Sequence, residues 1–575
     1  MKLTLKQPRF FASLALWWDL LIKYSSVREK MILLVLLAVA IGSAIFTVSG
    51  FVRRNTTLIA QAGGAYTEGA VGQPRHINPI LAGSNDLDRD ISNVIFSSLF
   101  KVNSNLEFEG DLASAYTISE DGRTYTITLK ENITWHDGAP FTAEDVLFTI
   151  RSIQTPDYDS PLESSFQGVQ VAAPDPRTVV FTLKEPYAPF LQNLTVGIVP
   201  KHVWEAVPPQ NAALAEQMLK PVGTGPFKFA EITTRRRTGE ITALRLVRND
   251  SYYGQHTYLD ELVFSFYATP DEALAALTTN QVDGVSFLPV SLAESVKNRS
   301  GITIHRLLLP QYFGLFFNPV KNDLLSDAGI RDALVLATDR QAIITEALAG
   351  EAKSLHTPIP PGMFTFNGEV DAPTFNPDVA RQNLEEAGWK DEDGNGIREK
   401  AGKELRFVIT TTDWPEYAQT AELVKKQWEA IGVAVETQSH GAGAIQQTVV
   451  GPRDYEVLLY GEVLSVDPDP YAFWHSTQTR NPGLNLSLFK DQQVDKLLEE
   501  ARKTLNVDER KAKYADFQQR FLELNPAIIL YQPYYLFAQR DDVRGLTVEQ
   551  ANLPDSRFND VELWHVRTKR IWNST

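Results

Sequence analysis

The most prominent hydrophobic pattern in the sequence is an uninterrupted apolar run near the N-terminus. MILLVLLAVAIGSAIFTVSGFV, residues 31–52, places 22 residues between Lys30 and Arg53. At a helical rise of about 1.5 Å per residue, the run is about 33 Å long, which is enough to cross the hydrocarbon core of a bilayer. The pattern therefore predicts one transmembrane helix.

Basic residues around this run predict its orientation. Six precede it and only two arginines follow closely, and positive charge favours the cytoplasmic side. We expect residues 1–30 to form a cytoplasmic or interfacial segment, with Trp17 and Trp18 at the interface, and residues 55–575 to lie on the extracytoplasmic face. A cleaved signal peptide is the alternative, because AVA at 38–40 resembles a cleavage site. That tripeptide lies inside the apolar run, behind a long leader, which favours a retained anchor.

Two hydrophobic periods alternate along the rest of the chain. A period of two predicts a strand at TYTITL, residues 124–129, and residues 527–538 are also rich in strand-forming side chains. A period near 3.6 predicts helices within 376–389, 414–436 and 494–501. The exported part is therefore predicted to be mixed α/β and to contain several lobes.

The stretch ITWHDGAPFTAEDV, residues 133–146, is a candidate catalytic cluster because it contains one histidine and three acids. Thr142 stands three residues before Asp145, which is the spacing of a capping box at the start of a helix. The dipole of that helix favours acids in its first turn. His136 and Asp137 are adjacent, so they point to opposite faces of an extended strand. We therefore interpret the stretch as structural.

Composition narrows the class of protein. A chain of 575 residues is long enough for roughly three or four domain-sized units. The absence of cysteine excludes disulfides, thiol nucleophiles, thiolate zinc sites and a lipid-modified cysteine anchor. The formal net charge is −16, and because residues 1–54 contribute +6, the remainder carries −22. Such an acidic body predicts no nucleic-acid partner, since phosphate binding needs a basic surface.

Catalytic motifs are missing from the sequence. No GxSxG, HExxH, P-loop or GxGxxG-after-strand pattern occurs, and the nine histidines have no metal-ligand spacing. The sequence therefore predicts a protein that is not an enzyme.

One loop is a candidate metal site. In DEDGNGIREKAG, residues 391–402, Asp391, Asp393 and Asn395 occupy the first, third and fifth places of a calcium-binding loop, and a glycine occupies the sixth. The twelfth place is also a glycine, so the usual bidentate carboxylate is missing. A plain turn between a helix and a strand is the alternative interpretation. No other cofactor is expected.

The most unusual polar cluster is LYGEVLSVDPDPYAFWHS, residues 459–476. Prolines follow Asp467 and Asp469 and keep both acids on extended backbone. Aromatic residues surround them, among them Tyr460 and Trp474. Carboxylates fixed among aromatic rings suit recognition of an ammonium group. A surface turn with aromatic side chains behind it explains the pattern equally well.

Taken together, these segments resemble the bacterial extracellular solute-binding proteins of family 5, the dipeptide and oligopeptide class of ABC importers. The resemblance covers roughly residues 64–570. It rests on several motifs in the family's order: AYTISEDGRTYTITLKENITWHDGAPFTAEDVLFTIRSI (115–153), PVGTGPFKF (221–229), LVRNDSYYG (246–254), IRDALVLATDRQAI (330–343) and DPDPYAFWHS (467–476).

The resemblance implies a bilobed Venus-flytrap fold, of the periplasmic binding protein-like class II, with an additional domain. Residues 53–75 are expected to be a tether that overlaps the start of the first lobe. The expected domains are 64–101, 222–313 and 540–570 for the first lobe, 102–221 for the additional domain, and 314–539 for the second lobe.

The resemblance also implies a function. A peptide would lie extended between the lobes, an acid would pair with its ammonium group, and closure would present the complex to the permease of an ABC importer. Asp467 is the expected acid and Asp469 the second choice, with Tyr312, Tyr460, Trp414 and Trp474 expected in the lining. We expect a monomer. A sugar, a nickel complex or another solute as ligand, and a sensory or assembly module without import, are the alternatives.

Overall fold

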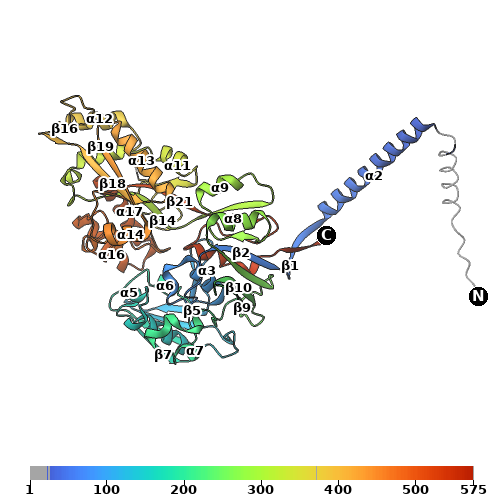
Figure 1. The fold of residues 1–575 in the computed structure, drawn as a ribbon. Helices are drawn as coiled ribbons and strands as arrows, with labels where there is room; N and C mark the ends of the chain where they lie inside the picture. The colour runs from blue at the N-terminus through green and yellow to red at the C-terminus, as the bar shows by residue number, and fades with distance from the viewer. Residues whose placement is uncertain (1–22, 24–25, 371, 574–575) are drawn as a thin grey trace, which may run out of the picture. The chain divides into compact units, whose positions relative to one another are not determined.

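The computed structural model describes residue 23 and residues 26–370 and 372–573 (Figure 1). The segment predicted to lie at the cytoplasmic interface, with Trp17 and Trp18, falls outside these residues. The chain divides into two compact units, one ending at Gln61 and completed by the C-terminal residues from Arg567, the other Ala62–Val566.

The first unit contains the predicted hydrophobic helix, α2 (Val27–Asn55). Ser26 caps it: its hydroxyl accepts a hydrogen bond from the Glu29 N–H, and the Glu29 carboxylate accepts one from the Ser26 N–H at 2.7 Å. None of the helix's residues is buried, and it is long enough and apolar enough to cross a membrane. The predicted helix is therefore confirmed as a helix.

The predicted tether contains regular structure. Strand β1 (Thr56–Gln61) pairs in antiparallel register with β22 (Arg567–Trp572), the last strand of the chain. β-Branched residues in both strands favour extended backbone, which explains the pairing. The C-terminal strand was expected in the first lobe, but it pairs with β1. The other domain boundaries stay predictions.

The second unit is built on one long mixed sheet. Its order is β19-β18-β20-β14-β21-β12-β2-β11-β10-β9, and β13 and β15 also pair with β21. The strands are β2 (Ala65–Val71), β9 (Phe227–Thr234), β10 (Ile241–Arg248), β11 (Glu261–Tyr267), β12 (Gly284–Val285), β13 (Ile302–Leu308), β14 (Gln311–Phe317), β15 (Ala352–Ser354), β18 (Arg406–Thr412), β19 (Ala434–His440), β20 (Val457–Val463) and β21 (Ala527–Arg540).

Two lobes divide this sheet between them, in agreement with the predicted bilobed α/β fold. The first lobe packs α3 (Asp86–Ile95), α8 (Pro270–Thr278) and α9 (Val290–Val296) around β2 and β9–β12. In the second lobe, helices cover both faces of the sheet (Figure 1). One face carries α10 (Ala328–Leu336), α11 (Arg340–Ala347), α12 (Pro377–Glu386) and α13 (Pro415–Glu429); the other carries α14 (Ala442–Ile445), α15 (Tyr471–Trp474), α16 (Gln492–Lys503) and α17 (Val507–Leu524).

Two segments connect the lobes. The chain leaves β13, passes Leu309 and Pro310, and enters β14. Strand β21 runs without a break through both lobes, pairing with β14 at one end and with β13 at the other. Gln532 in its middle donates a hydrogen bond to the Leu309 carbonyl at 2.7 Å, so the two crossing segments are joined where they pass each other.

A smaller antiparallel sheet, drawn in cyan in Figure 1, lies within residues 102–221. Its strands follow the order β5 (Ala113–Ile118), β6 (Thr124–Leu129), β8 (Thr178–Thr182) and β7 (Gln170–Asp175). It packs on α4 (Ala143–Ile153) and shares its core with the first lobe. The remaining short elements here are β3 (Phe100–Val102), β4 (Phe108–Gly110), α5 (Glu163–Phe166), α6 (Phe190–Asn193) and α7 (Lys201–Trp204).

The capping analysis of residues 133–146 is confirmed. Thr142 and Asp145 form the capping box that begins α4. His136 and Asp137 have different partners: the His136 ring accepts from the Gly223 N–H at 3.2 Å and bonds the Gly225 carbonyl at 3.1 Å, whereas Asp137 pairs with His202. Burial lowers the pKa of His136 to about 4. Residues 133–146 therefore have a structural role, because their polar side chains bond to other parts of the fold.

Candidate functional site

A large hollow in the second unit lies between the two lobes. This interlobe cavity has a volume of about 760 Å³. The first lobe contributes the start of α3, the loop around Phe287, and residues 552–554; the second contributes Gln311, Phe313 and the start of α13. A ligand in this cavity therefore contacts both lobes at once.

A second hollow opens beside strand β20 and shares six lining residues with the first. This edge cavity has a volume of about 320 Å³. Its lining residues are Phe287, Gln311, Phe313, Thr412, Trp414, Tyr417, Ala442, Leu459, Tyr460, Gly461, Glu462 and Val463.

Strand β20 has a free edge at this cavity. On one side it pairs with β14 along its whole length, from Val457 to Val463. On the other side β18 pairs with it only at Val457 and Leu458, after which the described residues provide no further strand partner. The C-terminal half of β20 therefore presents backbone groups to the edge cavity.

The antiparallel alternation identifies which groups these are. The Leu464 N–H donates to the Pro310 carbonyl at 2.6 Å, so this pair belongs to the hydrogen-bonded set. Every second residue along the ladder then faces β14, and the residues between them face the other way. Gly461 and Val463 therefore turn their N–H and C=O groups toward the free edge. A Cβ atom at position 461 would lie 2.6 Å from the Phe313 ring, which explains why a glycine occupies this position.

Aromatic side chains form the wall between the two cavities. Trp414 is 43% exposed and lies edge-on to Phe287 at 6.5 Å, while Phe313 stacks on Tyr417 at 4.6 Å. Trp414 and Tyr460 both line the edge cavity, where the sequence analysis expected ligand-lining residues. Direct ligand contact by either residue stays a prediction.

Tyr312 and Trp474 occupy a different place from the expected cleft wall. Both are buried in the second lobe, and the Trp474 indole N–H donates to the Tyr312 hydroxyl at 3.2 Å. Tyr312 in turn hydrogen-bonds Glu462. These two aromatic residues support the edge cavity from behind, because their rings belong to the core beneath β20.

Asp467 and Asp469 also lie away from the expected position. Asp467 is buried and pairs with Arg510 at 3.0 Å, and Asp469 pairs with Arg502 at 2.6 Å. Neither acid belongs to the described lining of the interlobe or edge cavity. Burial raises the pKa of Asp467 to about 6, and Arg510 opposes this effect. An arginine already pairs with each acid, so pairing with a ligand ammonium stays a prediction that this geometry does not favour.

The first lobe's wall is held by a buried arginine. Arg557 is fully buried and donates to both carboxylate oxygens of Asp90 at 2.7 Å and to Glu68 at 3.0 Å. Asp90 belongs to α3, whose first turn lines the interlobe cavity. Because this network joins the C-terminal segment to α3 and β2, it fixes the orientation of that wall.

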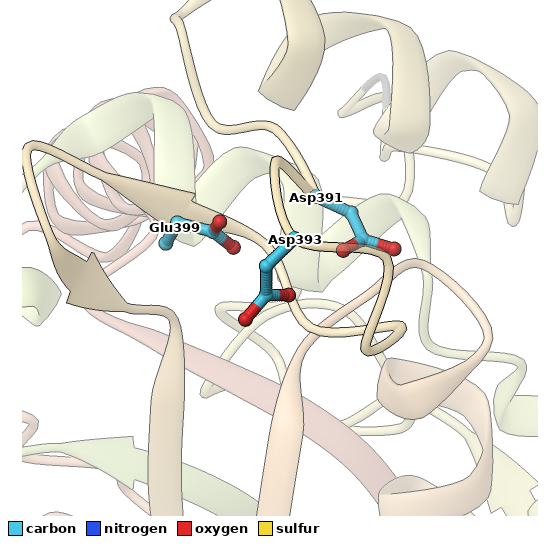
Figure 2. Close-up of side chains that lie close together, drawn as sticks. All are labelled: Asp391, Asp393 and Glu399. Carbon is cyan, nitrogen blue, oxygen red and sulfur yellow. The ribbon is translucent and has the colours of Figure 1, made fainter.

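The predicted calcium loop brings carboxylates together (Figure 2). Asp391 and Asp393 on the loop and Glu399 on the short strand β16 (Glu399–Lys400) place carboxylate oxygens within 4.8 Å of one another. The Asp391 carboxylate accepts hydrogen bonds from the Gly394 and Gly396 N–H groups at 2.8 and 3.0 Å. These bonds also suit a plain turn, so the calcium site stays a prediction, with Glu399 as an acid that the loop pattern missed.

Sequence reasoning also missed the free edge of β20 and Glu462. Both lie in the segment YGEV, where a glycine interrupts a strand between a tyrosine and an acid. A glycine inside a strand signals close approach of another chain or side chain, so this signal was available in the sequence. The sequence did not show that this part of β20 lacks a second strand partner, because that depends on where β18 stops pairing with it.

Comparison with known proteins identifies the fold family. The family model described as bacterial extracellular solute-binding proteins, family 5 Middle, matches residues 107–483 of this chain. The oligopeptide-binding protein AppA of Bacillus subtilis (strain 168) is 29% identical over 512 residues, which cover 88% of this chain and 92% of AppA.

Solved structures give the same result. The structure of AppA from Bacillus subtilis in complex with a nonapeptide aligns with a TM-score of 0.70 and 28% identity, covering 88% of this chain and 100% of that one. NikZ from Campylobacter jejuni in complex with Ni(L-His) aligns with a TM-score of 0.72 and 27% identity, covering 87% and 99%. Because the family match spans more than half of the sequence, this chain belongs to the bacterial extracellular solute-binding proteins of family 5.

Proposed function

We propose that this chain is the peptide-binding component of an ABC importer and that α2 holds it at the membrane. The observation that carries the proposal is the free edge of β20 at Gly461 and Val463, which faces a cavity between two lobes. An extended peptide adds to such an edge through its own backbone N–H and C=O groups. Binding of this kind accepts peptides of varied sequence, because every residue carries the same backbone groups.

The size and lining of the hollow support a peptide ligand. A volume of about 760 Å³ lies within the usual range for ligand sites and suits a short peptide. AppA, whose structure contains a nonapeptide, aligns over nearly the whole exported part. Residues from both lobes line the cavity, so a peptide stabilises the closed arrangement by contacting both. That closed form is the one that docks on a permease.

A nickel complex is the second candidate ligand, because NikZ aligns equally well and contains Ni(L-His). The described lining residues of the two cavities include no histidine and no cysteine, the side chains that bind nickel most readily. Backbone pairing at β20 instead favours the peptide. The family is one of binding proteins, and we propose that this chain makes and breaks no bond in its ligand.

Anchoring is part of the proposal. Helix α2 has Arg53 and Arg54 in its last turn, and the chain has no cysteine that a lipid could modify. Retention of α2 places the binding unit on the extracytoplasmic face as a single-pass membrane protein. N-terminal sequencing of the protein from membranes tests this: retained residues 31–52 support the anchor, and a start beyond residue 40 contradicts it.

The central experiment is a calorimetric titration of the purified binding unit with peptides of two to nine residues. We expect dissociation constants below the millimolar range for several unrelated sequences, and peptide carried through purification in native mass spectra. If Ni(L-His) gives binding heat and none of the peptides does, the nickel complex is the ligand and the peptide proposal is wrong. Recovery of permease and ATPase subunits by the full chain separates import from a purely sensory role.

A further inference from the structure

The last strand of the chain, β22, is held at the C-terminal end of α2. The Asn573 N–H donates to the Asn55 carbonyl at 2.8 Å, and the Asn573 side-chain oxygen accepts a hydrogen bond from the Thr57 hydroxyl at 2.6 Å. The Arg570 guanidinium donates to the Thr56 hydroxyl at 3.1 Å. Segments that lie at opposite ends of the sequence therefore meet where the apolar helix ends.

Trp572 indicates where this meeting point lies relative to a bilayer. Its ring is 6.2 Å from the ring of Phe51 in the last part of the apolar run, and the tryptophan is 62% exposed. Tryptophan is enriched where the hydrocarbon of a bilayer meets its headgroups. When α2 spans the membrane, Trp572 lies at that boundary, and the rest of β22 lies on the solvent side of it.

Five basic residues and no acid lie around this boundary. Arg53 and Arg54 directly follow the apolar run, and Arg567, Lys569 and Arg570 belong to β22. All five are exposed, and none forms a salt bridge among the residues that the structure describes. Residues 30–67 and 563–575 contain no aspartate or glutamate. Their charge is therefore available to an anionic group outside the chain.

The basic residues of β22 lie close to the expected headgroups. Because a strand rises about 3.3 Å per residue, Arg570 is about 7 Å and Lys569 about 10 Å along the strand from Trp572. Electrostatic attraction acts over a Debye length of about 8 Å at physiological ionic strength, so an anionic surface attracts both. The rest of the exported part carries a negative formal charge and is repelled by the same surface.

We propose that the β1–β22 sheet binds anionic phospholipid headgroups at the outer surface of the membrane that α2 spans. The inference rests on the proposed anchoring by α2 and adds a second, electrostatic contact with the bilayer. Lipid phosphate groups accept hydrogen bonds from the arginine and lysine side chains, and arginine binds phosphate with two parallel bonds. Since β22 is tied to the end of α2, this contact also restrains β1, from which the chain continues into the binding unit.

The absence of cysteine from the chain allows a test with a single introduced thiol. Thr568→Cys, at an exposed position of β22, is placed in the full chain, and the protein is reconstituted in nanodiscs. The nanodiscs contain phosphatidylcholine alone or with about one third phosphatidylglycerol. The rate constant for reaction with an uncharged polyethylene glycol maleimide measures the exposure of β22. Because each basic residue near an anionic surface strengthens the attraction about fivefold, we expect at least fivefold slower reaction in the anionic nanodiscs. High salt should remove the difference.

Charge variants in the Thr568→Cys background assign the effect to this strand. Arg567→Gln, Lys569→Gln and Arg570→Gln together should bring the two rate constants to within twofold of each other. Arg567→Lys, Lys569→Arg and Arg570→Lys together keep the charge and should keep the protection. Loss of protection in the charge-preserving variant as well would mean that the effect depends on something other than charge, and it would overturn the proposal.

The matched control removes three positive charges elsewhere. Arg235→Gln, Arg236→Gln and Arg237→Gln change the exposed turn between β9 and β10 and should keep the protection. Equal rate constants for the wild-type strand in both nanodiscs, protection that salt does not change, or loss of protection in this control overturns the proposal. Protection that requires added permease subunits assigns β22 to a protein surface instead and also overturns it. A full chain that does not stay with the nanodiscs overturns the proposed anchor.

Discussion

Arg502 is held by Asp469 and lies against Tyr187 of the additional domain. Its guanidinium donates to the Asp469 carboxylate at 2.6 Å and lies 5.2 Å from the centre of the Tyr187 ring. Its carbonyl accepts a hydrogen bond from the Ala188 N–H at 2.8 Å, and the neighbouring Lys503 pairs with Glu185 at 2.7 Å. Asp469, the second choice for the ligand's acid, therefore acts between domains, where it orients an arginine of the second lobe.

Arg502→Ala should loosen this contact and weaken the closed arrangement. We expect the peptide Kd to rise about fivefold to tenfold, which corresponds to roughly 1 kcal/mol. Calorimetry measures the Kd, and small-angle scattering of the liganded protein measures compaction. Lys496→Ala, on the same helix but 77% exposed at its side chain, is the matched control. Equal affinity and equal scattering in both variants would show that the contact is passive.

Gly461→Val should block the edge cavity. Its first side-chain carbon would meet the Phe313 ring at 2.6 Å, so the ring is pushed into the hollow. We expect a loss of about 1–3 kcal/mol in the free energy of unfolding from overpacking, together with at least a tenfold weaker peptide affinity. Gly443→Ala, which meets nothing within 4 Å, should change neither quantity. Unaltered peptide binding by a folded Gly461→Val protein contradicts the assignment of this edge.

Acid should destabilise the protein through His136. Burial lowers its pKa to about 4 in the folded state, below the usual value near 6.5 in the unfolded chain. The unfolded chain takes up this proton first, so the free energy of unfolding falls as pH drops from about 6.5 to 4, by about 3 kcal/mol from this residue. His136→Gln should remove that component. The check is urea unfolding of both proteins at several pH values; identical pH slopes would contradict it.

Calcium should stabilise the folded protein if the loop at residues 391–402 binds it. If the loop binds the ion, calcium at 100 times its Kd raises the free energy of unfolding by about 2.7 kcal/mol. Differential scanning calorimetry with calcium and with a chelator measures the difference. Asp391→Asn combined with Asp393→Asn should abolish it, and magnesium should substitute poorly. If the wild type melts at the same temperature in both conditions, the loop is a plain turn.

Local rules predicted the parts of the fold that depend on neighbouring residues. Thr142 and Asp145 begin α4, because capping needs only backbone and side chains three residues apart. The apolar run gave α2 for the same reason, since length and hydrophobicity suffice. The bilobed architecture came from resemblance, because periodicity alone does not order strands within a sheet.

The site was harder to predict because it depends on partners distant in sequence. The two acids of the DPDP segment looked free, but Arg502 and Arg510 come from α16 and α17, and nothing local indicates that they meet. Tyr312 and Trp474 looked like lining residues and instead support Glu462 from the core. The free edge at Gly461 follows from where β18 stops pairing, which only the assembled sheet reveals.

Strand β21 belongs to both lobes and lies near the middle of the long sheet. Neither lobe is therefore complete without residues that come late in synthesis. A chain that stops before Ala527 leaves two half-sheets, one ending at β14 and the other at β12, and each of these strands then has an unpaired edge that can pair with other chains. The two halves of the sheet therefore finish together, once β21 has been made.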